Sequence, residues 1–133
     1  MKWSDAYATG IDQLDRHHQM LFAMSEDFRV ALDEGGGERS YGSMLESLAN
    51  YARGHFGIEE ACMARYHCPV AEANSGAHAR FMEALKGFQQ RQRIRGFSRP
   101  DAYELVEFLD RWLADHIARI DVKLRTCIKE IKE

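Results

Sequence analysis

Three short breaks divide the sequence of 133 residues into four long segments in which apolar residues recur at helical spacing. The breaks are the run Gly35–Gly37, the stretch 66–69 and the stretch 96–100. The segments between them have roughly 25 to 30 residues, about twice the mean helix length of ~11–12 residues. Antiparallel bundles with short loops need helices of this length. The sequence therefore predicts an all-α fold, an antiparallel up-down-up-down four-helix bundle.

The composition fits one globular domain, which we expect to span residues 1–133. Hydrophobic residues make up 45% of the chain, which is enough for a core at this length. The net charge is −3, from 18 basic and 21 acidic residues without a basic block, so nucleic acid is not an expected partner. The N-terminus lacks a signal-peptide core, and no apolar run approaches the ~20 residues that span a bilayer. We therefore expect a cytoplasmic protein without a membrane span.

The cysteines give a further expectation about the cellular environment. Cys62, Cys68 and Cys127 form an odd set, and no C-x-x-C pair occurs. This pattern argues against a disulfide framework and against a zinc ribbon, so we expect reduced thiols. Cys62 follows Glu59 by about one helical turn, where the role of a small core residue is favoured over that of a reductant for a nearby metal.

Each segment carries one stripe of residues that we expect to face the interior of the bundle. The stripes advance in steps of three and four residues, the pattern of a bundle seam. In the first two segments they comprise Ile11, Leu14, His18, Leu21, Ser25, Phe28 and Leu32, and then Met44, Leu48, Tyr51, His55, Glu59, Cys62 and Tyr66. In the last two they comprise Val70, Asn74, His78, Phe81, Leu85 and Phe88, and then Leu105, Leu109, Trp112, His116, Ile120 and Leu124.

Most of the six histidines fall on these stripes, one in each segment: His18, His55, His78 and His116. Taken singly, a histidine on such a stripe is more often a hydrogen-bonded core residue. Four histidines at similar heights, with Glu59 beside them, would each destabilise the fold by roughly 1–3 kcal/mol if they were buried without partners. A metal satisfies them together, because imidazole suits iron, zinc and copper, and carboxylates bridge two ions. His17, about 100° from the seam, and His67, in a turn, are predicted to be surface residues.

Two carboxylates are placed to reach such a metal site. Glu59 follows His55 by four residues, so both project from one helix face about one turn apart. Asp121 follows His116 by five residues, which puts the two about 140° apart around the helix axis. That offset suits a carboxylate that leans round to bridge two ions rather than one that binds beside His116.

Four motifs, in this order, resemble those of the bacterial hemerythrin family. The run Leu14–Phe22, preceded by Gly10-Ile11, is similar to its first-helix pattern I-D-x-x-H-x-x-L/F, and H-F-G-I-E-E at 55–60 resembles its H-F-x-x-E-E. H-A-R-F at 78–81 matches the end of its H-x-x-x-H-x-x-F. W-L-A-D-H-I at 112–117, with Asp121, resembles its W-L-x-x-H-I-x-x-x-D. Together the motifs cover nearly the whole chain, and the resemblance implies a four-helix bundle with a metal site in its core.

The resemblance implies a non-haem di-iron centre, two Fe ions with an oxo or hydroxo bridge. It assigns His18 and His55 to one iron. It assigns His78 and His116 to the other iron, and Glu59 and Asp121 to the bridge between them. The second iron would take a third histidine in the family, four residues before His78, and this chain has Asn74 there. An amide oxygen is a poor substitute for imidazole on iron. We therefore expect Asn74 to be a weak ligand or none, with water or an exogenous ligand in its place.

The missing imidazole affects the expected function. A reversible carrier must release dioxygen without oxidising its irons, and the loss of a histidine together with extra water access works against that. We therefore expect a redox or oxygen sensor domain without catalytic residues, whose ligands are dioxygen, nitric oxide or azide-like anions. The alternatives are a dioxygen carrier or storage protein, and a di-iron enzyme that handles peroxide or nitric oxide. Domains of this family occur fused to diguanylate cyclases and chemotaxis receptors, so such a signalling module, fused or separate, is a candidate partner.

Overall fold

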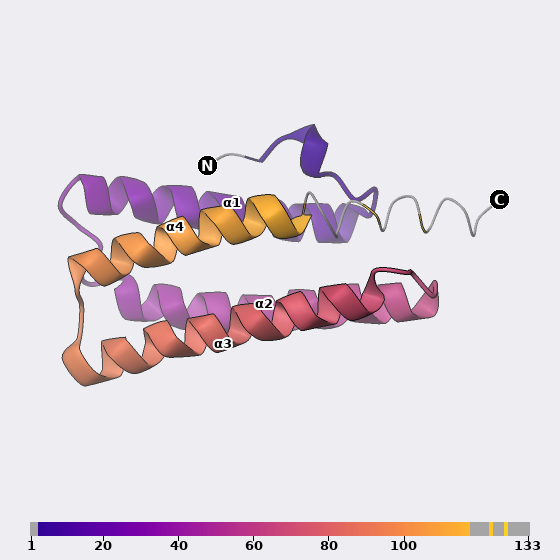
Figure 1. Cartoon of the computed structure of the whole chain (residues 1–133). Coiled ribbons are helices and arrows are strands. Elements are labelled where there is room, and N and C mark those ends of the chain that lie inside the picture. The colour runs from indigo at the N-terminus through magenta and orange to yellow at the C-terminus, as the bar shows by residue number, and fades with distance from the viewer. Residues whose placement is uncertain (1–2, 118–122, 124–126, 128–133) are drawn as a thin grey trace.

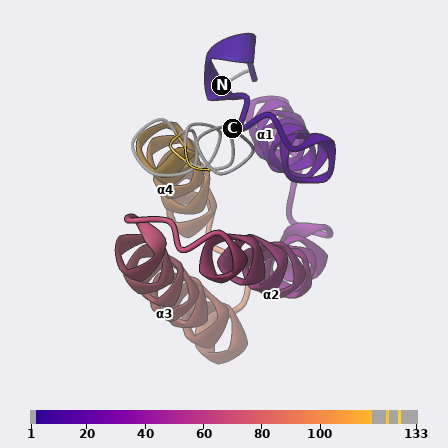
Figure 2. The same cartoon turned by 90° about the vertical axis from the view of Figure 1, so that its right-hand side faces the viewer.

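Four long helices run antiparallel along one bundle axis (Figure 1). They are seen in a computed structural model that describes residues 3–117, 123 and 127. A short 3-10 helix, η1 (Asp5–Tyr7), precedes α1 (Asp12–Asp33), α2 (Tyr41–Arg65), α3 (Ala71–Arg95) and α4 (Arg99–His116). Seen end-on, the four helices occupy the corners of the bundle in chain order (Figure 2). The predicted up-down-up-down four-helix bundle is confirmed.

Local sequence features set the ends of these helices. In the first turn of α1, the Asp15 carboxylate accepts hydrogen bonds from the backbone N–H and the hydroxyl of Thr9, which precedes the helix, at 2.7 and 2.8 Å. α3 ends at Gly96, whose φ of 72° lies in the left-handed region that favours glycine. Ser98 then caps α4, because its hydroxyl oxygen accepts a hydrogen bond from the Asp101 N–H at 3.4 Å. The last break in the sequence is therefore a capped helix boundary.

The buried faces of α1 and α3 agree with the predicted stripes. Every predicted member that lies within these two helices is buried: Leu14, His18, Leu21, Ser25, Phe28 and Leu32 on α1, and Asn74, His78, Phe81, Leu85 and Phe88 on α3. Ser25, the polar member on α1, donates a hydrogen bond from its hydroxyl to the Asp110 carboxylate of α4 at 2.7 Å. A stripe with helical spacing therefore identified the interior face of both helices.

On α2 the predicted stripe is wrong at two positions. Ala52 and Met63 are fully buried, whereas Tyr51 and Cys62 are only half-buried. At 3.6 residues per turn, a row of side chains spaced by three and four residues drifts around the helix axis over several turns. The buried row on α2 therefore passes through the residue next to the predicted one at both places.

The apolar core consists of two clusters, with the polar stripe residues between them. A large cluster extends from the α1–α2 and α3–α4 loops as far as Phe56, Phe81 and Leu113. A small cluster lies at the opposite end, beside the α2–α3 loop, and contains Leu14, Met63, Cys68 and Cys127. Within the part of the chain that the structure describes, no helix is both long enough and apolar enough to cross a membrane. The boundary between the two clusters is where the stripe histidines lie.

Candidate metal centre

Four histidines and one glutamate meet in the middle of the bundle. Each helix supplies one histidine: His18 from α1, His55 from α2, His78 from α3 and His116 from the last position of α4. Glu59 comes from α2, one turn after His55. All five side chains are buried, with exposed fractions of 0% to 5%. The structure thus brings together five of the residues that the sequence predicted to bind metal.

Glu59 lies at the centre of this group and presents one carboxylate oxygen to each pair of histidines. Its Oε2 is 3.5 Å from His18 Nε2 and 3.2 Å from His55 Nε2. Its Oε1 is 3.0 Å from His78 Nε2 and 3.6 Å from His116 Nε2. We call these two halves the α1–α2 side and the α3–α4 side, after the helices that supply the histidines.

The spacing within each histidine pair fits a shared metal ion. The Nε2 atoms of His18 and His55 are 2.8 Å apart, and those of His78 and His116 are 3.1 Å apart. Two nitrogens that bind one ion at about 2.1 Å, at a right angle to each other, lie about 3.0 Å apart. On each side the three donor atoms lie within 4.8 Å of one another. The donor set therefore fits two ions bridged by Glu59, and imidazole with carboxylate suits iron.

The charge on Glu59 also suits a cation. Burial raises the pKa of this carboxyl, but hydrogen bonds from the surrounding histidines, His116, His18, His55 and His78, outweigh that effect and hold the pKa well below its usual range. Glu59 is therefore an anion at neutral pH, enclosed by groups that are themselves good metal ligands. A buried carboxylate is stable only when its charge is compensated, and a metal ion compensates it directly.

His55 and His78 each have a hydrogen-bond partner on the outer ring nitrogen. His55 Nδ1 lies 3.1 Å from His17 Nδ1, and His78 Nδ1 lies 3.1 Å from Glu60 Oε1. A neutral histidine that binds metal through Nε2 carries its proton on Nδ1 and donates it outward. His17 and Glu60 are therefore placed to accept these protons and to fix the orientation of the two imidazoles.

The prediction that His17 is a surface residue is wrong. Its side chain is half-buried, and its ring lies edge-on to Tyr51 with the centroids 5.2 Å apart. Burial, followed by the proximity of His55 and His18, lowers the pKa of His17, so its imidazole is neutral and able to accept a hydrogen bond. The position of His17 to one side of the buried stripe of α1 directs its side chain toward α2 rather than into solvent. His67 is exposed in the α2–α3 turn, as predicted.

Two further predicted residues complete the expected donor set. Asn74 lies on the buried face of α3, one turn before His78, and is fully buried. Asp121, the expected second bridging carboxylate, lies outside the described residues, as do Ile120 and Leu124 of the predicted fourth stripe. The ligand roles of Asn74 and Asp121 therefore stay predictions.

The sequence also matches a known family over most of its length. Residues 9–127 match the family model of the hemerythrin HHE cation binding domain. The chain belongs to the hemerythrin family. A bacteriohemerythrin of Stenotrophomonas maltophilia is 28% identical over 116 residues, which cover 86% of this chain and 72% of the relative. A hemerythrin-like protein of Naegleria gruberi and a myohemerythrin of Riftia pachyptila are each 26% identical over 123 residues, which cover 92% of this chain and 89% of each relative.

Aromatic rings cover the α3–α4 side of this hemerythrin centre. The Phe56 ring stacks on His78 with the centroids 3.8 Å apart, and Trp112 stacks on His116 at 4.3 Å. Trp112 and His116 also line a pocket of about 430 Å³ between α3 and α4, together with Phe81, Phe108, Arg80 and Arg111. The α3–α4 side can therefore be approached from the surface of the bundle by a small ligand.

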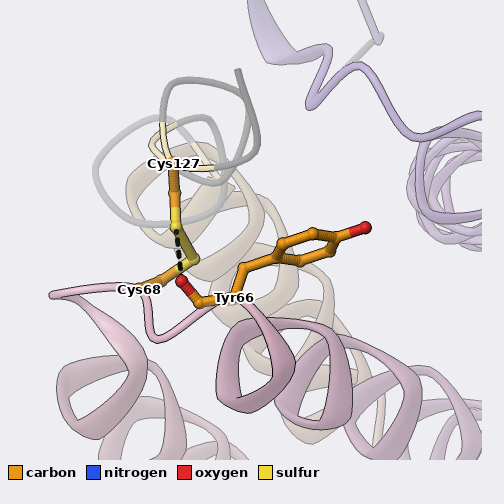
Figure 3. The surroundings of a disulfide bond; sticks show 3 residues. All are labelled: Tyr66, Cys68 and Cys127. Atoms are coloured by element: carbon orange, nitrogen blue, oxygen red, sulfur yellow. Dashed lines mark hydrogen bonds between the residues drawn. A yellow bond between two sulfur atoms is a disulfide. The ribbon is translucent and has the colours of Figure 1, made fainter. Parts of the chain in front are cut away.

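Two of the three cysteines of this hemerythrin domain are paired. Cys68, in the α2–α3 turn, and Cys127, beyond α4, form a disulfide with their Cα atoms 5.7 Å apart (Figure 3). The expectation of reduced thiols is wrong for this pair, whose separation of 59 residues concealed the pairing in the sequence. Cys62 is free and half-buried, and burial, followed by the charge of Glu59, raises the pKa of its thiol. Cys62 therefore stays protonated at neutral pH.

Proposed function

We propose that this hemerythrin domain holds a non-haem di-iron centre and binds dioxygen or a similar small ligand as a redox or oxygen sensor. The observation that carries the proposal is that Glu59 presents a different oxygen to each of two histidine pairs. A carboxylate placed between two sets of imidazoles suits a bridged pair of metal ions. A single ion would require the donors to converge on one point, whereas the two donor groups share only Glu59.

On the α1–α2 side, His18, His55 and Glu59 Oε2 would hold one iron. On the α3–α4 side, His78, His116 and Glu59 Oε1 would hold the other, and Asp121 would be a second bridge. Two irons bound there would supply electron exchange with dioxygen. His17 and Glu60 would hold the imidazoles of their partners in the binding orientation. Burial of the four histidines and Glu59 would keep bulk water away.

We favour a sensor because of the composition of the α3–α4 side. Asn74 replaces the third histidine of the family pattern and leaves a position that water, dioxygen, nitric oxide or an azide-like anion can occupy. The pocket at His116 gives such ligands a route to the same side. A signalling module of the diguanylate cyclase type, fused or separate, would convert this event into an output. A cytoplasmic location suits that role.

A dioxygen carrier is the second candidate. It is favoured by the similarity to a myohemerythrin over 92% of this chain. The two functions differ in the lifetime of the dioxygen complex, since a carrier must release its ligand unchanged over many cycles. Rapid oxidation of the diferrous protein on first contact with dioxygen would favour the sensor, and repeated reversible binding would favour the carrier.

Reconstitution tests the di-iron proposal. Anaerobic incubation of the metal-free chain with ferrous iron is expected to give two irons per chain by metal analysis. His55→Ala and Glu59→Ala are expected to lose the visible absorption of an oxo-bridged ferric pair. His67→Ala, a matched change on the exposed turn, is expected to keep it. One iron per chain would refute the dinuclear centre, and none would refute metal binding altogether.

A further inference from the structure

The disulfide ties the turn between α2 and α3 to a residue beyond the end of α4. Cys68 lies in the turn immediately before α3, which carries His78, and Cys127 lies beyond the end of α4, which carries His116 (Figure 3). Cys62, the remaining cysteine, is free and α1 contains no cysteine, so no disulfide ties α1 to its neighbours. The two halves of the centre are thus supported differently.

The disulfide belongs to the small apolar cluster that closes this end of the bundle. Leu14 and Met63, each one helical turn from a donor residue, pack with both cysteines. Cys68 and Cys127 are buried, with exposed fractions of 5% and 7%. A change in the pairing of the sulfurs therefore acts on the packing directly beneath the centre rather than on a distant surface.

The surroundings of Cys127 also suit the reduced form. Its Sγ lies 3.6 Å from the carbonyl oxygen of Tyr66, along the dashed line of Figure 3. A disulfide sulfur has no hydrogen to donate, whereas a thiol is a weak donor to a carbonyl. A free thiol also behaves as a small hydrophobic group and is compatible with an apolar cluster. Reduction would therefore remove the covalent tie and leave Cys127 with an acceptor already in place.

We propose that Cys68 and Cys127 form a reversible redox site whose state controls how tightly the α3–α4 side binds its metal. This inference rests on the metal-binding function proposed above. The reductant is a dithiol or two molecules of a small thiol, which attack the disulfide through a mixed disulfide. The Cys68–Cys127 S–S bond breaks, its sulfurs gain two electrons and two protons, and the reductant is oxidised to its own disulfide. In a reducing cytosol, the location proposed above, disulfides are usually transient and catalytic or redox-sensing.

The effect should be selective for one side of the centre. With the tie intact, Cys68 and Cys127 are held together before the metal arrives, so less ordering accompanies binding. Loss of a group hydrogen-bonded to a metal ligand lowers metal affinity about 10- to 100-fold, and the disulfide, which lies farther from the ligands, should have an effect at the low end of that range. We expect reduction to weaken binding at His78 and His116 about tenfold, and to affect binding at His18 and His55 less.

Cobalt(II) titration of the full chain tests this inference. The metal-free protein is titrated anaerobically in its oxidised form and again after reduction and removal of the reductant, with the thiols counted by alkylation and mass measurement. Two binding events are expected for the oxidised chain. After reduction, one event should weaken about tenfold, and re-oxidation should restore it. The same event should be missing in oxidised His116→Ala, which assigns it to the α3–α4 side.

Matched cysteine variants control for general effects. Cys62→Ser should titrate like the parent in both states, and a Cys68→Ser, Cys127→Ser double variant should resemble the reduced chain in both. If the double variant does not fold, the reduced parent chain still gives the comparison. Identical titrations of the oxidised and reduced parent, equal weakening of both events, or failure to re-form the Cys68–Cys127 bond would each overturn the inference. Absence of cobalt binding in both states would instead refute the proposed metal-binding function.

Discussion

Replacing His17 tests whether an imidazole outside the donor set controls metal binding on the α1–α2 side. His17 accepts the outer proton of His55 in the arrangement that metal binding requires. His17→Leu removes that acceptor with little change in size, whereas His17→Gln keeps an amide oxygen that can accept the same proton. If the hydrogen bond orients His55, the leucine variant should bind metal more weakly on this side and the glutamine variant should be close to the parent.

The size of the effect follows from the contact. The nitrogen–nitrogen separation of 3.1 Å is normal for a hydrogen bond, and His55 is only 2% exposed. Leaving a buried donor without an acceptor costs about 1–3 kcal/mol. Since about 1.4 kcal/mol corresponds to tenfold in a binding constant, we expect His17→Leu to weaken the α1–α2 event by about 10- to 100-fold.

The assay is an anaerobic titration against a coloured chelator that competes for the metal, so that both binding events are resolved. His67→Leu is the matched control, because it makes the same change at an exposed histidine. The α3–α4 event should be unchanged in His17→Leu. An unchanged α1–α2 event, or equal losses on both sides, would show that His17 does not position His55.

Three further outcomes are expected. Asn74→His should complete the family's three-histidine set. Stopped-flow mixing with dioxygen should then show slower autoxidation than in the parent, and anion titration should give one azide per centre instead of two. Autoxidation rates and azide counts equal to the parent's would remove this support for a sensor. Trp112 stacks 4.3 Å from His116, so copper(II) bound at His116 should quench the fluorescence of Trp112. The quenching should disappear in Trp112→Phe but persist in Trp3→Phe. The depressed pKa of Glu59 stabilises the metal-free fold above the ordinary carboxyl pKa, and this contribution is lost as pH falls through the folded-state pKa. Urea unfolding should therefore show a free energy of unfolding that falls on acidification more steeply in the parent than in Glu59→Gln.

The predicted donor positions depended on relations within single helices. Residues four apart share a helix face, so His55 and Glu59 had to point the same way. Burial of each apolar stripe then brings all four stripes to the bundle axis, and the stripe histidines come with them. This is why the meeting of these five side chains could be predicted from spacing within each helix. Their common height along the bundle required only that the four helices align.

Contacts between helices could not be predicted in the same way. His17 and His55 are 38 residues apart, and Cys68 and Cys127 are 59 apart. Whether such residues touch depends on the rotation and height of one helix relative to another, which no local period specifies. The shifted buried row on α2 has a different cause, the drift of the row around the helix axis, which buries Ala52 and Met63 in place of the residues beside them.

The two sides of the centre are supported by different groups, and Glu59 connects them. On the α1–α2 side, His17 backs His55 inside the bundle. On the α3–α4 side lie Asn74, the pocket at His116 and the disulfide. Because both histidine pairs face the same buried carboxylate, a change of charge on one side alters the electrostatic potential at the other with little screening by water. A charged ligand that binds on the α3–α4 side would therefore alter the electrostatic potential on the α1–α2 side without reaching it. This coupling supports the proposed sensor function, because ligand binding on one side would alter the properties of both bound ions.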